Sequence, residues 1–75
     1  MVNNILLIKD LSRLSGHSIY TLKYYLKLGL IREIGRSPET GFRYFDEETL
    51  ERLKKIRALQ LQGLSLRQIL LKVNA

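Results

Sequence analysis

The fold is decided by residues 9–29, KDLSRLSGHSIYTLKYYLKLG, where two short amphipathic segments are separated by a glycine. The first segment ends at Gly16, and glycine is the residue that most readily takes the left-handed conformation at the end of a helix. The second begins at Ser18, a favourable N-cap, and ends before Gly29, so it predicts a helix over residues 18–28. Two short helices joined by a glycine turn indicate a helix-turn-helix.

The helix predicted over residues 18–28 has two different faces. Ile19, Leu22 and Leu26 are spaced i, i+3 and i+7, which places them on one inward stripe. The outward face combines cations with phenols, namely Tyr20, Lys23, Tyr24 and Lys27. A helix fits the major groove of DNA, and phosphates accept hydrogen bonds from lysine, arginine and tyrosine side chains. This face is therefore suited to holding DNA.

The tyrosines of this helix also have a purely structural interpretation. Tyr20 and Tyr24 can instead pack against neighbouring helices and keep their hydroxyls in water. The two interpretations stay open for Tyr20, whereas the lysines on either side of Tyr24 favour contact with DNA. Tyr25 lies at the border between the faces, where we expect its ring to point inward and its hydroxyl outward.

A β-hairpin is predicted over residues 32–45. Residues 37–41, SPETG, have the composition of a turn, and the FRYF that follows is β-prone. Alternation along that strand places Arg43 and Phe45 on the same side. Beside a DNA-reading helix, Arg43 would reach a phosphate or the minor groove. The alternative is a solvated strand arginine, and the sequence leaves both open.

Two more helices are predicted after the hairpin, over residues 46–62 and 65–73. Asp46 is the expected N-cap of the first, and the glutamates that follow it suit the positive end of the helix dipole. Ser65 and Gln68 have the spacing of a capping box at the start of the second. The four acids around Asp46 are thus explained by helix formation.

The expected fold is a single, mostly α domain over residues 1–75, with four helices and a small β-hairpin. Its composition is basic, with 13 Lys or Arg against 7 Asp or Glu and a net charge of +6. Four of the seven acids lie within residues 46–51, so the positive excess is concentrated elsewhere. Such a field attracts polyanions, and nucleic acid is the first partner to consider. The alternative is a charged face that only keeps a small protein in solution.

Catalysis and metal binding have little support in the sequence. There is no cysteine, and the single histidine, His17, cannot complete a ligand set alone. Glu47 and Glu48 are adjacent and point about 100° apart on a helix, so they form no facing acid–base pair. We expect His17 on the surface, no enzymatic activity and no cofactor. The longest apolar run, residues 5–8, is too short to span a membrane, and we expect a cytoplasmic protein.

Four short motifs follow one another along the chain: TLKYY at 21–25, GLI at 29–31, GFRYF at 41–45 and GLSL at 63–66. Together they resemble the DNA-binding domain of the MerR family of bacterial transcription regulators, over about residues 6–73. The resemblance implies a winged helix-turn-helix. In it, residues 18–28 form the recognition helix and residues 32–45 the wing.

The resemblance also implies roles for individual residues. Tyr24 and Tyr25 would be the tyrosines that hold phosphates, and Arg43 the wing arginine. Lys23 stands in place of the family's usual arginine, which keeps the charge but loses the bidentate fork. The complete predicted DNA-binding set is Ser18, Tyr20, Thr21, Lys23, Tyr24, Tyr25, Lys27, Arg36 and Arg43.

Family members act as dimers on promoter DNA. The implied partners are double-stranded DNA, a second copy bound through a helix that this chain lacks, and RNA polymerase, which uses the promoter that the dimer bends and untwists. The chain is then either an excised DNA-binding domain or a short stand-alone member. Two other functions stay open: an excisionase-like architectural factor of a mobile element, and a protein-interaction adaptor that docks a partner through Leu28, Leu61 and Leu71.

Overall fold

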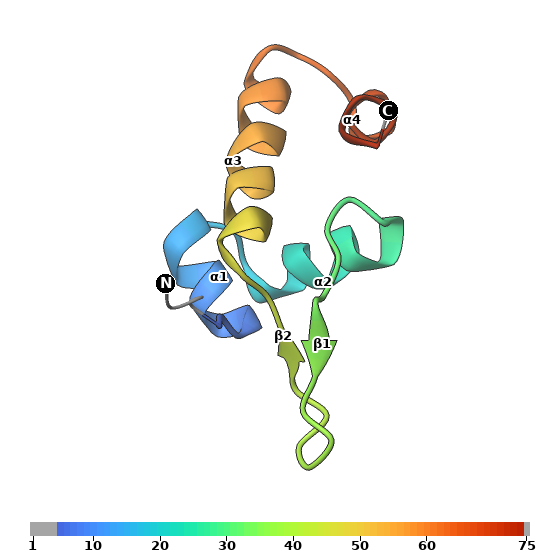
Figure 1. The fold of residues 1–75 in the computed structure, drawn as a ribbon. Coiled ribbons are helices and arrows are strands. Elements are labelled where there is room, and N and C mark those ends of the chain that lie inside the picture. The colour runs from blue at the N-terminus through green and yellow to red at the C-terminus, as the bar shows by residue number, and fades with distance from the viewer. Residues whose placement is uncertain (1–4, 75) are drawn as a thin grey trace.

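The structure is a computed structural model that describes residues 5–74. Within this range the chain forms four helices and one two-stranded hairpin, in the order α1 (Ile8–Ser15), α2 (Ile19–Leu28), β1 (Gly35–Arg36), β2 (Arg43–Tyr44), α3 (Glu47–Leu61) and α4 (Leu66–Val73). The predicted fold class, four helices with a small hairpin, is confirmed. Figure 1 shows the hairpin extending from one end of the molecule and α4 lying at the other.

The helix ends follow from local hydrogen bonding. The Ser18 hydroxyl accepts from the Thr21 amide at 3.1 Å at the start of α2, and the Asp46 carboxylate caps α3. Gly16 and Gly29 end α1 and α2 with φ of 77° and 82°, a conformation in which other residues are strained. The helix-turn-helix geometry is therefore specified by residues within a few positions of each turn.

The hairpin predicted over residues 32–45 is present, but its ladder of paired residues is shorter than that range. Its register pairs Gly35 with Tyr44 and Arg36 with Arg43, and nothing more. The strand after the turn does not continue along the hairpin, because Phe45 turns into the core. There it exchanges backbone hydrogen bonds of 2.7 and 2.8 Å with Leu6, which lies before α1. The base of the hairpin is thus attached to the start of the fold.

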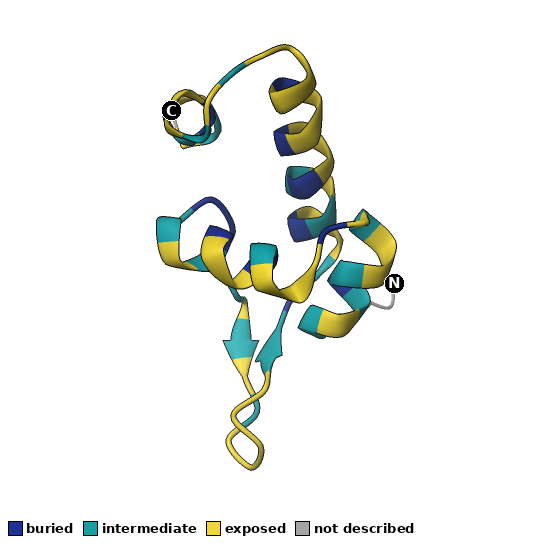
Figure 2. Cartoon of the chain, turned by 180° about the vertical axis from the view of Figure 1, so that it is seen from behind, coloured by how far each residue is buried: buried dark blue, intermediate teal, exposed yellow. Residues whose placement is uncertain are grey.

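The core lies where all four helices meet the base of the hairpin, with α1 packed against α2 and α3 and α4 packed against α3. Its members are Leu11, Leu22, Tyr25, Leu30, Ile31, Phe45, Leu53, Ile56, Leu59 and Ile69. Figure 2 shows the buried side of α3 turned toward the interior. The inward stripe predicted for α2 is wrong at Ile19, which is 39% exposed, because this residue begins the helix at the edge of the core.

Arg52 of α3 connects three parts of the fold. Its Nε donates to the Leu30 carbonyl at 2.6 Å, and its Nη2 donates to the Val73 carbonyl at 3.3 Å and to the Asn74 side chain. The first carbonyl follows α2 and the second ends α4, where carbonyls have no partner within the helix. One guanidinium therefore satisfies the backbone at both places and joins α4 to the rest of the chain.

Replacing Arg52 with methionine keeps the apolar stem of the side chain and removes these bonds. We expect a loss of about 1.5–3 kcal/mol in the free energy of unfolding, because hydrogen bonds from a charged donor are the strong ones. Urea unfolding measures this loss, and amide exchange should accelerate most in α4. The control is Lys54→Met, because Lys54 lies two positions further along α3 and makes none of these contacts. It should change the free energy of unfolding by less than about 0.5 kcal/mol. Equal losses in the two variants would contradict the role given to Arg52.

Candidate nucleic-acid interface

The outward face of α2 is at the surface, as its spacing predicts. Tyr20 is 84% exposed and Tyr24 is 47% exposed, and Lys23 and Lys27 are exposed beside them. The alternative in which Tyr20 packs against a neighbouring helix is wrong, because most of its side chain is in solvent. Two cations and two phenols are thus available together on one helix.

Ser18 and Thr21, also predicted to contact DNA, are bonded to each other. The Ser18 hydroxyl donates to the Thr21 hydroxyl at 2.9 Å while it accepts from the Thr21 amide. These bonds fix the first turn of α2 and leave it at the surface. The N-terminus of a helix attracts anions through its free amides and its dipole, so this end of α2 favours phosphate.

The side chain of Tyr25, on α2, packs against that of His17, in the turn before α2. Tyr25 is 4% exposed, and its ring centroid lies 5.5 Å from that of His17 in an edge-on arrangement. The inward direction predicted for the Tyr25 ring agrees with this, and almost none of its side chain is left exposed for DNA. The expectation of a surface His17 is wrong, because the turn between α1 and α2 folds the imidazole against Tyr25 and leaves it 8% exposed.

The surroundings of His17 disfavour its protonated form. The Ser15 hydroxyl is 3.3 Å from Nδ1, and the Ser12 hydroxyl donates to the His17 carbonyl at 2.7 Å. Burial, and next the positive charge of Arg57, lower the pKa of the imidazole, against a smaller opposing effect of a hydrogen bond with the Ser15 backbone. The neutral ring is therefore part of the packing that holds α2 in place.

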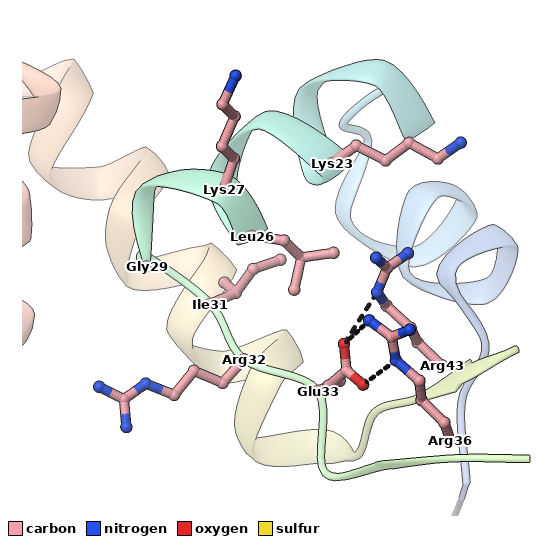
Figure 3. Close-up of a pocket in the computed structure, with 9 residues that line it drawn as sticks. All are labelled: Lys23, Leu26, Lys27, Gly29, Ile31, Arg32, Glu33, Arg36 and Arg43. Carbon is pink, nitrogen blue, oxygen red and sulfur yellow. Dashed lines mark hydrogen bonds and ion pairs between the residues drawn. The ribbon is translucent and has the colours of Figure 1, made fainter. Parts of the chain in front are cut away.

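Residues of α2 and of the hairpin meet at a shallow groove of about 740 Å³ (Figure 3). Its charged and polar lining brings together residues far apart in the sequence, namely Lys23, Lys27, Arg32, Glu33, Arg36 and Arg43. Four of the predicted DNA-binding residues are among them. The geometry joins the helix and hairpin parts of the predicted site into one basic surface.

Glu33 and Arg32 are the charged members of this groove that the sequence analysis did not single out, and Glu33 is the one bonded to other members. Its carboxylate accepts from Arg36 Nε at 2.5 Å and Nη2 at 3.1 Å, and from Arg43 Nε at 2.9 Å. The hydrogen bond from Arg36 is the main reason why the pKa of Glu33 lies below its usual value. The short separation of Glu33 and Arg36 in the sequence could have indicated their ion pair. The ion pair of Glu33 with Arg43 could not be found in this way, because it depends on the register of the hairpin.

The arrangement is suited to binding a polyanion. Lysine and arginine side chains in a shared groove neutralise phosphates, and a flanking helix presents side chains to base edges. Across residues 5–74, no three histidine, aspartate or glutamate side chains are grouped so as to hold a metal ion. In the same range, no helix has both the length and the apolar character needed to cross a lipid bilayer.

Known proteins share this sequence pattern. Residues 6–73 match the family model described as MerR HTH family regulatory protein. The mercuric resistance operon regulatory protein of Bacillus cereus is 37% identical over 62 residues, which cover 83% of this chain and 46% of that protein. A second relative, an uncharacterized HTH-type transcriptional regulator of Haemophilus influenzae, is 41% identical over 54 residues, 72% of this chain and 39% of its own length. The chain therefore spans less than half the length of these relatives.

Solved structures share the fold. A MerR family transcriptional regulator from Bacillus cereus superimposes with a TM-score of 0.87 at 22% identity, over 96% of this chain and 53% of that one. The structure of HiNmlR, a MerR family regulator lacking the sensor domain, was determined bound to promoter DNA. It superimposes with a TM-score of 0.76 at 32% identity, over 88% of this chain and 49% of that one.

The buried His17 predicts a pH dependence of stability. Because its pKa is lower in the folded chain than the usual 6.5, the unfolded chain takes up the proton first as the pH falls. Its stabilising contribution is therefore complete above about pH 6.5 and decreases below it, until the folded-state pKa is reached. Urea midpoints measured from pH 8 to pH 5 should show this decrease, and His17→Gln should flatten it. An unchanged slope in the variant would assign the pH dependence to other groups.

Proposed function

The chain belongs to the MerR family of helix-turn-helix regulatory proteins and is a DNA-binding domain of that family, and from this we propose how its surface binds double-stranded DNA. In our proposal α2 enters the major groove as the recognition helix, and the hairpin follows the adjacent backbone as a wing. The observation that supports this arrangement is the groove in which Lys23 and Lys27 of α2 meet Arg43 of the hairpin.

The exposed side chains of α2 have distinct roles in this proposal. Tyr20 and Lys23 face base edges or phosphates in the major groove, and Tyr24 and Lys27 hold the backbone on one side of it. Lysine at position 23 donates from a point charge, so it reads a guanine edge with less geometric selectivity than an arginine. Phosphate contacts supply most of the affinity, and sequence discrimination comes from the few side chains that reach bases.

The remaining predicted contacts are weaker or indirect. Ser18 and Thr21 order the first turn of α2 and present its amides to a phosphate. Tyr25 is buried in the core and attaches α2 to it, so it leaves almost no surface for DNA. Arg36 lines the groove but is held by Glu33. We therefore assign the principal contacts to Tyr20, Lys23, Tyr24, Lys27 and Arg43.

The wider biological role is also a proposal. A relative solved on promoter DNA supports transcription regulation, in which a dimer distorts the promoter for RNA polymerase in the cytoplasm, without any enzymatic step. Two such domains would bind half-sites related by the symmetry of the dimer. Leu61 and Leu71, which the adaptor alternative would use to dock a partner, are 83% and 71% exposed on α3 and α4, whereas Leu28 is half-buried.

Removing single contacts of α2 tests the recognition-helix assignment. Lys27→Ala should lower the slope of log K against log salt by about 0.9 and weaken binding about eightfold near 0.1 M salt, as one phosphate contact is lost. Tyr24→Phe should weaken binding about two- to tenfold, as for one hydrogen bond. Fluorescence anisotropy with labelled duplex DNA measures both changes.

The control is Lys54→Ala, which removes the same charge from α3, where Lys54 lies 3.3 Å from Glu51 and outside the groove. Its binding should stay within about twofold of that of the unchanged chain, since exposed ion pairs contribute little. If Lys27→Ala behaves like Lys54→Ala, α2 is not the element that lies on the DNA.

A further inference from the structure

Glu33 is the single acid among the described residues that line the basic groove. It lies between α2 and β1, at the point where the chain enters the hairpin. Its side chain is 28% exposed, and both of its oxygens accept hydrogen bonds from arginines. A surface where a polyanion is proposed to bind thus contains one carboxylate, on its hairpin side, and the two neighbouring arginines give an electrostatic reason for it.

The register of the hairpin places two like charges opposite each other. Arg36 of β1 and Arg43 of β2 are direct partners across the ladder. Like charges in such a cross-strand pair destabilise it, and a ladder of only two residue pairs is short. Glu33 bonds to both guanidinium groups and so offsets their repulsion. Glu33 therefore stabilises the hairpin in the absence of DNA.

The three hydrogen bonds divide the arginines unequally. Arg36 gives Nε and Nη2 to the carboxylate, a paired arrangement that is the strong form of this contact. Arg43 gives Nε alone. In Figure 3 the two terminal nitrogens of Arg43 point away from Glu33 toward α2. A phosphate can engage both of them while the bond from Nε to Glu33 persists.

We propose that Glu33 is a positioning and specificity-determining residue that withholds Arg36 from DNA in an internal ion pair and presents Arg43 to a phosphate. This inference rests on the proposed DNA-binding function. One cation fewer acts on the backbone, so affinity for arbitrary duplex DNA is reduced, because that affinity comes from phosphate contacts. Contacts between α2 and the bases are unaffected, so the ratio of specific to non-specific binding rises.

The test is Glu33→Gln in the full 75-residue chain, with anisotropy titrations on a duplex of random sequence between about 50 and 200 mM salt. Glutamine has the same shape and no charge, so Arg36 becomes free to reach a phosphate. We expect the slope of log K against log salt to steepen by about 0.9 and the affinity near 0.1 M salt to rise about eightfold. Arg36→Ala added to Glu33→Gln should abolish this gain.

A matched control separates this effect from a general change in charge. Glu51→Gln removes one acid from α3 and frees Lys54, which lies 3.3 Å from Glu51 and outside the groove. Its affinity should stay within about twofold of the unchanged chain. If Glu51→Gln gains as much as Glu33→Gln, or if the gain survives Arg36→Ala, the inference is overturned.

NMR signals of the arginine side chains report contact with DNA directly. They would not change in this way if Glu33 affected only the stability of the fold. In the unchanged chain, the Arg43 side-chain signals should shift on addition of DNA while the Arg36 Nε–H signal stays in place. In Glu33→Gln both should shift. A large shift of Arg36 in the unchanged chain would show that phosphate displaces Glu33, and would refute the division of roles.

The outcomes also distinguish this inference from the function on which it rests. If the unchanged chain binds no duplex DNA, both are refuted. If Lys27→Ala and Tyr24→Phe leave binding unchanged while Glu33→Gln gains as expected, the assignment of α2 fails and the role of Glu33 stands. If the α2 variants weaken binding while Glu33→Gln changes nothing, only the role of Glu33 is lost.

Discussion

The burial of one face of α2 is the constraint on which the rest of the structure depends. Leu22 and Tyr25 are held in the core on a helix of ten residues, and this fixes the direction of Tyr20, Lys23, Tyr24 and Lys27 on the opposite side. A helix this short is not stable alone in water, so packing must supply its order. His17 contributes to that packing as a neutral ring against Tyr25.

Local chemistry explains why so much of the fold was predictable. Each helix start and each glycine turn is determined by residues within about four positions, so Ser18, Asp46, Ser65 and Gly29 are visible in the sequence. The exposed face of α2 follows from helical spacing in the same way. These features need no knowledge of distant partners.

The features that escaped prediction all join distant parts of the chain. The bridge between Leu6 and Phe45, the contacts of Arg52 with Leu30 and Val73, and the bond from Arg43 to Glu33 span 39, 22, 21 and 10 positions. No periodicity reports such pairs. His17 was placed wrongly for the same reason, because its burial comes from the way the turn folds against Tyr25.

The hairpin is anchored to the core at its base and exposed to solvent at its far end. Phe45 is fully buried and bonded to Leu6, whereas Pro38, Glu39 and Thr40 are exposed and lie beyond a ladder of only two residue pairs. The tip is closed by its own backbone, with the Ser37 amide bonded to the Phe42 carbonyl at 2.9 Å and the Gly41 amide to the Ser37 carbonyl at 2.8 Å. The attachment at Phe45 therefore sets the direction in which this closed turn leaves the helices.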